Sequence, residues 1–223
     1  MLSAADQAAF WITLRLATTS TLCLLVLGIP LAWWLARTAS RWKTPVETLI
    51  ALPLVLPPTV LGFYLLLLLG ASGPLGRLAI WLGGQPLAFR FAGLVIGSVI
   101  YSLPFVVQPL QNSFAGLAAS HLDAAATLGA GPLDRFLSLV LPLSRRGLIT
   151  AATLGFAHTL GEFGVVLMIG GNIPGRTQVL SIAIYDHVEA LEYPQAHLLS
   201  AGLLVFSLLL LALVYGYQRR ARG

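Results

Sequence analysis

Long apolar segments dominate the pattern of hydrophobic and polar positions along the chain. Five segments stay apolar over about twenty residues or more, the length at which a helix can cross a membrane. They cover residues 11–35, 49–70, 91–110, 147–170 and 198–217. An α-helix rises about 1.5 Å per residue and the hydrocarbon core is about 30 Å thick, so each segment is long enough to span it. The pattern predicts an all-α, polytopic membrane protein with five transmembrane helices, forming a single transmembrane domain over residues 1–223.

Composition supports this class. Hydrophobic residues make up 57% of the chain and charged residues 9%, whereas about 25% of a soluble domain is charged. The one cysteine, Cys23, lies inside the first apolar segment, and a single thiol forms neither an internal disulfide nor a multi-thiolate metal site. The net charge is +5. In a membrane protein the distribution of the charges over the loops matters more than their sum, so no nucleic-acid partner is expected.

The basic residues of the connecting loops are distributed unevenly. Nine lie in the loops on one side of the predicted spans and three on the other. The richer side holds Arg37, Arg41, Lys43, Arg135, Arg145, Arg146, Arg219, Arg220 and Arg222, and the poorer side holds Arg77, Arg90 and Arg176. Basic flanks are retained in the cytoplasm. The N-terminus is therefore expected outside the cell and the C-terminus in the cytoplasm, as five spans require.

The cytoplasmic loop between the third and fourth spans, residues 111–146, is long for a simple connection. A first helix is predicted over residues 120–128, followed by Gly129, a residue suited to a helix end that needs positive φ. A second helix is predicted to begin near Pro132 and to end at Pro142. Its apolar face is expected to consist of Phe136, Leu139 and Val140. The loop is thus predicted to form a helix-turn-helix along the inner membrane face.

The spacing of residues in this loop resembles the EAA loop of ABC importer permeases. The matching residues are Asp123, Ala124, Ala125, Gly129, Leu139, Leu141 and Pro142. In that family the loop is the coupling helix that inserts into a groove of the cytoplasmic ATPase, and Asp123 stands where glutamate is usual. Small side chains allow two backbones to approach closely. An amphipathic surface hairpin without a partner is the alternative interpretation.

Two further stretches resemble oxyanion permeases. Residues 53–62 are similar to the second span of molybdate permeases, and residues 161–185 to a stretch shared by molybdate, tungstate and sulfate permeases. The resemblance covers nearly the whole chain and implies a multi-pass protein of the bacterial cytoplasmic membrane, a type I, binding-protein-dependent importer. It also implies the partners: a second copy in a homodimer, a pair of ATPase subunits, a periplasmic oxyanion-binding protein and membrane lipid.

Prolines interrupt the second predicted span. Pro53, Pro57 and Pro58 remove backbone donors from it, and a membrane tolerates this only where protein or a water-filled cavity compensates. The span is expected to begin with a broken or kinked segment facing the bundle interior. Pro57, Pro58 and Thr59 are predicted to line or shape the transport pathway, with a packing kink remote from the pathway as the alternative.

Glu162 is the only acid within a predicted span, and such residues are interpreted as functional. Because a carboxylate repels an oxyanion, the residue is expected to be part of a gate or of a structural ion pair. Arg15 is the candidate partner. Gly161 and Gly164 complete the set of pathway or gate candidates, whereas His158, one turn earlier, is interpreted as a satisfied core residue.

The last outer loop, residues 172–195, predicts an interfacial helix with one charged and one apolar face. The charged residues are Arg176, Asp186, Glu189 and Glu192, and the apolar stripe is Leu180, Ile184 and Val188. By the family resemblance these charges lie on a surface that receives the binding protein, where they would set encounter rate and orientation. A solvated face over an apolar anchor is the alternative.

The chain lacks the phosphate-binding pattern G-x-x-x-x-G-K-[ST]. ATP and Mg²⁺ are therefore expected on a separate chain, and this chain is expected to carry no cofactor, metal site or catalytic residue and not to be an enzyme. The predicted function is the permease subunit of an ATP-driven molybdate importer. The alternatives are a sulfate or tungstate permease of the same architecture and an ATP-independent channel or carrier.

Overall fold

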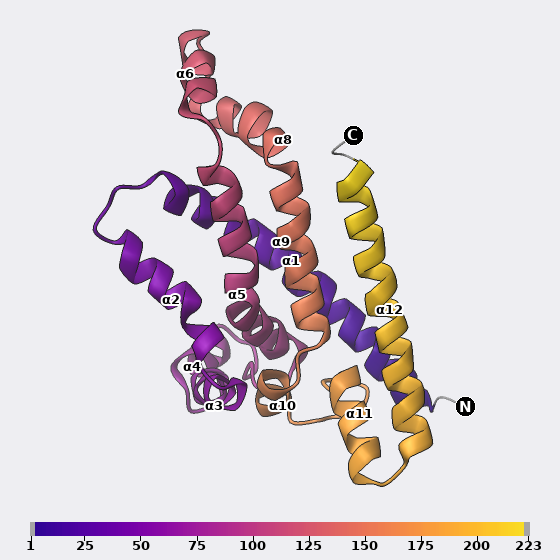
Figure 1. Ribbon diagram of the computed structural model, residues 1–223. Helices are drawn as coiled ribbons and strands as arrows, with labels where there is room; N and C mark the ends of the chain where they lie inside the picture. Colours follow the sequence, from indigo (N-terminus) through magenta and orange to yellow (C-terminus); the bar gives the residue numbers. More distant parts are fainter. Residues whose placement is uncertain (1–2, 221–223) are drawn as a thin grey trace.

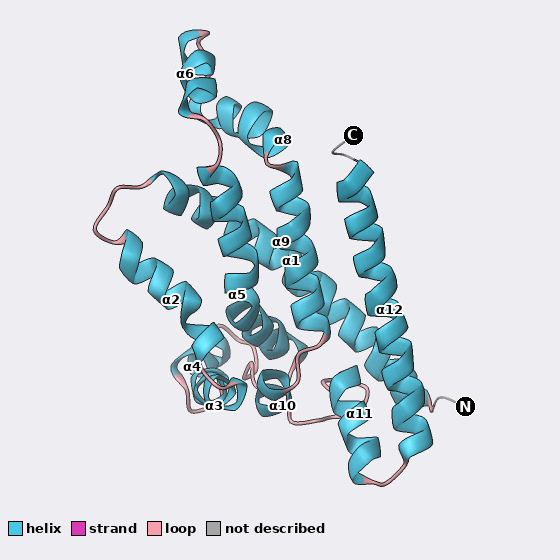
Figure 2. Ribbon diagram, in the orientation of Figure 1, coloured by secondary structure: helices cyan, strands magenta, loops and turns pink. Residues whose placement is uncertain are grey.

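Helices joined by short turns make up the computed structural model, which describes residues 3–220 and contains no strand among them (Figure 2). The elements are α1 (Ala4–Arg37), α2 (Lys43–Val55), α3 (Pro58–Leu69), α4 (Pro74–Trp81), α5 (Phe91–Ala115), α6 (Ala119–Thr127), α7 (Pro132–Asp134), the π-helical η1 (Arg135–Val140), α8 (Leu141–Leu143), α9 (Arg145–Leu160), α10 (Gly164–Gly170), α11 (Leu180–Glu189) and α12 (Tyr193–Arg220). The prediction of an all-α fold is confirmed.

Four helical segments within the described residues are long and apolar enough to cross a membrane, and a bent pair makes a fifth candidate. The four are Ala4–Arg37, Pro58–Trp81, Phe91–Ala115 and Tyr193–Tyr217, and the pair is Arg145–Leu160 with Gly164–Gly170, bent by 60°. Several helices extend beyond the apolar segments because polar residues continue them. At the start of α1, Ser3 and Asp6 form a capping box, which satisfies backbone donors that have no partner within the helix.

The second predicted span is broken within its first half. Helix α2 ends at Val55, α3 begins at Pro58, and Leu56 between them is extended, with φ −72° and ψ 135°. A residue that precedes proline is pushed out of the helical region by steric conflict with the proline ring. The expected break is therefore present, but it lies seven residues into the predicted 49–70 segment and divides it into two separate helices.

The core forms where α1 crosses α5 and α9 (Figure 1). Leu24, Val106 and Leu110 are fully buried there. Small residues allow the close approach: a Cβ on Gly155 of α9 would lie 2.6 Å from Val106 Cγ2, and one on Gly28 of α1 would lie 3.2 Å from Val106 Cγ1. Glycines at helix crossings are typical of membrane proteins, where van der Waals contact replaces hydrophobic driving force.

The two ends of the molecule differ. The α6 end holds α6, α8 and the C-terminal end of α12, whereas the α11 end holds α10, α11 and the start of α1 (Figure 1). At the α6 end, the guanidinium of Arg37 donates to the main-chain carbonyls of Phe114 and Leu117, each at 3.3 Å. Of the basic residues assigned to this side, Arg222 and the side chains of Arg219 and Arg220 lie outside the described part of the chain.

Asp186 on α11 does not behave as the free surface charge that the sequence suggested. Its carboxylate accepts hydrogen bonds from Asn172 Nδ2 at 2.9 Å and from Gln178 Nε2 at 2.8 Å, so it fastens the preceding loop to the helix. Glu189, by contrast, is exposed, and among the described residues it accepts only from Tyr185, one turn earlier on the same helix. The helix lies within the predicted 172–195 segment, but one of its expected rim charges holds the fold together.

Removing the two carboxylates separately is expected to give unequal effects. Asp186→Ala leaves two amide donors without an acceptor and should cost about 1–3 kcal/mol of stability. Glu189→Ala, on the exposed face, should cost less than about 0.5 kcal/mol. The thermal unfolding midpoints of the two purified variants measure this difference, and equal midpoints would contradict the assignment.

His187 joins three elements at the α11 end. Its Nε2 lies 2.9 Å from Asp6 Oδ1 of α1, and its Nδ1 lies 2.7 Å from Glu192 Oε2, next to the start of α12. Only the doubly protonated ring donates from both nitrogens. The hydrogen bonds to Asp6 and Glu192 raise the pKa of His187 above its usual 6.5, so the charged ring fastens α1, α11 and the start of α12 together.

This contact makes stability depend on pH. A group whose pKa is raised on folding contributes fully below its unfolded pKa, and the contribution is lost as pH rises through the higher folded value. The parent chain should therefore exceed His187→Gln by about 1 kcal/mol, or about 2–4 °C in Tm, at pH 6, and the difference should vanish at alkaline pH. Paired thermal melts from pH 5.5 to 9 test this, and a difference that stays constant with pH would refute it.

Candidate functional site

The bend between α9 and α10 is the first component of the site. Gly161, Glu162 and Phe163 are not helical, and the two helices meet at 60°. Gly161 ends α9 by donating its backbone N–H to the carbonyl of Ala157 at 3.3 Å. The bend lies on a candidate span, so its irregular backbone has to face protein or a water-filled space.

The second component is the first turn of α3, just after the proline break. It lies directly against α10: a Cβ on Gly164 would be 2.8 Å from Pro58 Cβ, and a Cβ on Gly62 would be 2.7 Å from Met168 Cβ. No side chain fits at either glycine without displacing a neighbour. The fold thus brings together residues 58–62 and 161–168, about a hundred positions apart in the chain.

These components supply most of the lining of a cavity of about 590 Å³. It is lined by Pro58, Thr59, Tyr101, Ala157, His158, Gly161, Glu162, Phe163, Gly164, Leu167 and Met168. The sequence predicts six residues for a pathway or gate, and five of them belong to this lining. The sixth, Pro57, precedes α3 as its N-cap residue and lies outside it. Two motifs that the sequence could only treat separately therefore form one site.

Glu162 is buried, with 4% of its surface exposed, and neither carboxylate oxygen has a hydrogen-bond partner among the described residues. Ser98 of α5, also buried, lies beside it without a hydrogen bond of regular geometry. The proposed pairing with Arg15 is wrong, because Arg15 is exposed on α1 and its guanidinium lies 4.5 Å from the centre of the Phe91 ring. The main-chain carbonyl of Glu162 accepts from Ser181 Oγ at 2.6 Å, which ties the bend to α11.

His158 lies on the cavity wall, a position that sequence reasoning did not assign to it. Its Nδ1 is 2.8 Å from Ser102 Oγ, and its ring stacks on Phe105 with centroids 3.9 Å apart and an interplanar angle of 24°. The ring of Tyr101 lies 4.7 Å away. The sequence contained one indication of an aromatic surface for this histidine. Tyr101 and Phe105 are four residues apart on one helix, so both rings lie on the same face.

A smaller cavity of about 290 Å³ follows toward the α6 end. It is lined by Leu54, Pro104, Phe105, Gln108, Pro109, Asn112 and Leu154. Its two amide side chains, Gln108 and Asn112, lie one turn apart on α5, and both are exposed. Because Phe105 lines this cavity and His158 lines the larger one, their stacked rings form the wall between the two.

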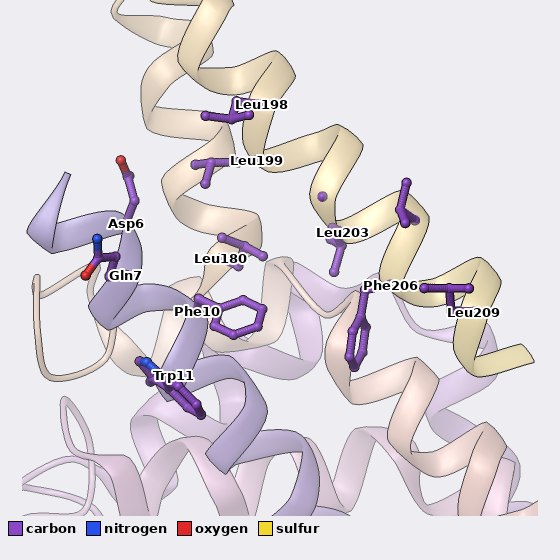
Figure 3. Close-up of a pocket in the computed structure, with 12 residues that line it drawn as sticks. Asp6, Gln7, Phe10, Trp11, Leu180, Leu198, Leu199, Leu203, Phe206 and Leu209 are labelled. Carbon is purple, nitrogen blue, oxygen red and sulfur yellow. The ribbon is translucent and has the colours of Figure 1, made fainter. Parts of the chain in front are cut away.

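A third space, of about 550 Å³, lies between the start of α1 and α12. Figure 3 shows Phe10, Trp11, Phe206 and Leu209 directed toward it, with Asp6 and Gln7 toward one side. Apart from those two residues its lining is apolar, so it offers an anion few hydrogen-bond donors. Only 6% of the apolar window of α12 is buried in the chain.

The loop at the α6 end presents an open surface. No residue of α6 is buried, and Asp123, Ala124 and Gly129 are all exposed. Gly129 has φ +85°, and a Cβ at this position would meet no atom within 4 Å, so the residue supplies the left-handed turn between the two helical segments, as predicted. Leu139 and Leu141 are partly buried beneath that surface.

The second helical segment of the loop differs from the prediction in its geometry. It runs from Pro132 to Leu143 through the π-helical turn η1, and Pro142 lies within α8 instead of ending the helix. A π turn changes the backbone pairing pattern, so the missing N–H of Pro142 is accommodated. Phe136 anchors the segment, its ring 5.5 Å from that of Trp33 and 6.4 Å from that of Phe114. The base of the loop thus packs on α1 and α5.

Comparison with known proteins gives the family. Residues 28–222 match the model of the binding-protein-dependent transport system inner membrane component. The chain belongs to this family. It is 58% identical to the molybdenum transport system permease protein ModB of Azotobacter vinelandii over 222 residues, covering 100% of this chain and 98% of that protein.

More distant relatives include two different transport systems. The ModB protein of Escherichia coli K12 is 36% identical, over 81% of this chain and 79% of its own length. The sulfate transport system permease protein CysT of Salmonella typhimurium is 33% identical, over 96% of this chain and 76% of its own length. These relatives are permease proteins, which agrees with the expectation of a transport subunit and not an enzyme.

Solved structures share the fold at low sequence identity. A chain of a bacterial alginate ABC transporter superposes with a TM-score of 0.79 at 17% identity, covering 98% of this chain and 80% of that one. A chain of the MetNI methionine ABC transporter in an inward-facing conformation superposes with a TM-score of 0.73 at 17% identity, covering 98% of this chain and 99% of that one. The arrangement of helices described above is therefore that of ABC transporter permeases.

Proposed function

We propose that this chain is the permease subunit of an ATP-driven importer that moves molybdate across the bacterial cytoplasmic membrane. The observation that carries the proposal is the 58% identity to a molybdenum transport permease over the full length of both chains. The sulfate permease is also related, but at 33% identity. This ranking favours molybdate over sulfate, and tungstate is the oxyanion of most similar chemistry to be compared with it.

The working transporter has more than one chain. A second copy of this chain completes the pathway across a two-fold axis, because isologous pairing is the commonest arrangement of identical subunits and one copy encloses its cavities only in part. A pair of cytoplasmic ATPase subunits binds ATP and Mg²⁺. A periplasmic oxyanion-binding protein delivers the substrate to the α11 end.

The α6 end faces the cytoplasm and the N-terminus faces outward. Support comes from Arg37, Arg145 and Arg146, which lie at the α6 end in agreement with the retention of basic flanks inside the cell. The exposed surface around Asp123 and Gly129 then faces the ATPase. This surface, with Leu139, Leu141 and Pro142 at its base, is the proposed docking element.

Coupling follows from the connectivity of α9. This helix begins directly after the docking loop and ends at the Gly161 bend, so a displacement of the loop is carried along a rigid helix to the cavity. ATP closes the ATPase pair, the loop moves with it, and the cavity lined by Pro58, Thr59 and Gly164 changes its access from one side of the membrane to the other. Pro57 and Glu162 lie at the two backbone breaks on which such a change can pivot.

The decisive experiment is uptake of labelled molybdate into proteoliposomes that hold this chain with its ATPase and binding protein. We expect uptake that requires ATP, resists excess sulfate and is competed by tungstate according to relative affinity. Competition by sulfate at equal concentration would instead assign a sulfate permease of the same architecture. Uptake that proceeds equally without ATP would assign a channel or carrier and overturn the importer.

A further inference from the structure

The larger cavity has an unusual set of polar groups for an anion pathway. Among the described residues that line it, polar side chains come from Thr59, Tyr101, His158 and Glu162, and none is lysine or arginine. Both carboxylate oxygens of Glu162 are shielded from the open space. An anion that enters the cavity therefore meets neutral hydrogen-bond donors instead of a fixed positive charge.

The hydrogen bonds around His158 are compatible with a ring proton on Nε2, the nitrogen that does not contact Ser102. Ser102 Oγ lies 2.8 Å from Nδ1 and 3.1 Å from Thr159 Oγ1. Ser102 is fully buried, and its hydroxyl has one proton to donate. When Ser102 donates to Nδ1 and accepts from Thr159, all three groups are paired and the ring proton lies on Nε2. That N–H has no partner among the described residues.

The neighbouring rings hold this donor in place. Phe105 stacks on one face of the imidazole, and Tyr101 packs at 4.7 Å between centroids. Tyr101 also lines the cavity, and its hydroxyl makes no hydrogen bond to a described residue. Both rings line the same cavity, and each carries a neutral donor that has no partner among the described residues.

We propose that His158 Nε2–H and the Tyr101 hydroxyl form a transient binding site for a tetrahedral oxyanion in the pathway. The stacked Phe105 and His158 rings form its inner barrier. The inference rests on the proposed function and adds the substrate contact within this chain. Neutral donors suit a pathway, because conduction needs a site that attracts the ion yet releases it. Beyond the barrier, the amides of Gln108 and Asn112 offer the next donors of the same kind.

A matched pair of substitutions at His158 tests the site. His158→Asn places an amide near the position of Nδ1 and can keep the Ser102 contact, but it lacks a donor at the Nε2 position. His158→Gln reaches the Nε2 position with its amide and loses the Ser102 contact. Both remove the stacked ring, so a role confined to packing predicts equal losses for the two variants.

The measurement is ATP-dependent molybdate uptake by the complete transporter in proteoliposomes, with ATPase activity stimulated by the binding protein measured on the same samples. We expect His158→Asn to lower maximal uptake at least tenfold and His158→Gln to keep it within threefold of the parent. Tyr101→Phe, which keeps the ring and removes only the hydroxyl, should lower uptake about tenfold. ATPase activity should change less than twofold in all three, which also reports that each variant folds and assembles.

Each outcome decides for or against the site. Equal losses for His158→Asn and His158→Gln, or unchanged uptake in His158→Asn or Tyr101→Phe, would overturn it. If the parent transports sulfate or tungstate in place of molybdate, the same comparison is made with that oxyanion. A parent chain that moves no oxyanion with ATP refutes the proposed function itself and the site with it, and this failure is recognised from the parent alone.

Discussion

Replacement of Gly164 by valine is expected to abolish ATP-dependent uptake, with a loss of at least tenfold. A Cβ at this position would lie 2.8 Å from Pro58 Cβ and 3.7 Å from the backbone nitrogen of Thr59. Neither neighbour can move aside without a cost in energy, because Pro58 is a rigid ring at the first turn of α3. Overpacking of this kind typically costs about 1–3 kcal/mol. Here it would also separate α3 from α10 and deform the cavity between them.

A glycine three residues earlier provides the control. Gly161 lines the same cavity, but a Cβ there would meet only the carbonyl oxygen of Ala157, at 3.8 Å. Gly161→Ala should therefore keep uptake within about twofold of the parent, and both variants should be compared in proteoliposomes at equal protein. Normal uptake by Gly164→Val would show that the contact between α3 and α10 does not shape the pathway.

Gly129→Trp should abolish assembly with the ATPase, so that the ATPase no longer co-purifies with the permease. The residue has φ +85°, a conformation that costs other residues about 1–2 kcal/mol. It lies in the middle of the exposed loop surface, where an indole would separate the loop from a partner. The substitution thus acts on both the turn and the docking surface.

Two further variants separate these effects. Gly129→Ala brings the backbone strain without the bulk, and it should reduce co-purification only partly. Gly175 has φ +71° and open space around it as well, but it lies in the loop at the α11 end, before α11. Gly175→Trp should leave ATPase assembly intact. Loss of assembly in Gly175→Trp, or full assembly in Gly129→Trp, would contradict docking through the loop at the α6 end.

The sequence alone determined the fold class. Continuous apolar segments of about twenty residues favour helices inside a bilayer, because each helix satisfies its own backbone hydrogen bonds. The helical loop with its turn at Gly129 was also predictable from the sequence, since glycine favours positive φ and proline favours a first helical turn. The proline break was expected from residues 53–58 for the same local reason, although the extended residue Leu56 was not assigned.

The partners of the site residues were decided by the tertiary structure. Nothing local to Gly164 or Pro58 indicates that they touch, because their contact depends on how α3 and α10 cross. Glu162 was paired with Arg15 on the basis of depth alone, but the rotation of α1 directs Arg15 to Phe91. The position of His158 on the cavity wall depends on α5, which supplies its hydrogen-bond partner Ser102 and its stacking partner Phe105. Short-range periodicity fixes which residues form helices, whereas the angles and rotations at which helices pack are set by contacts between distant segments.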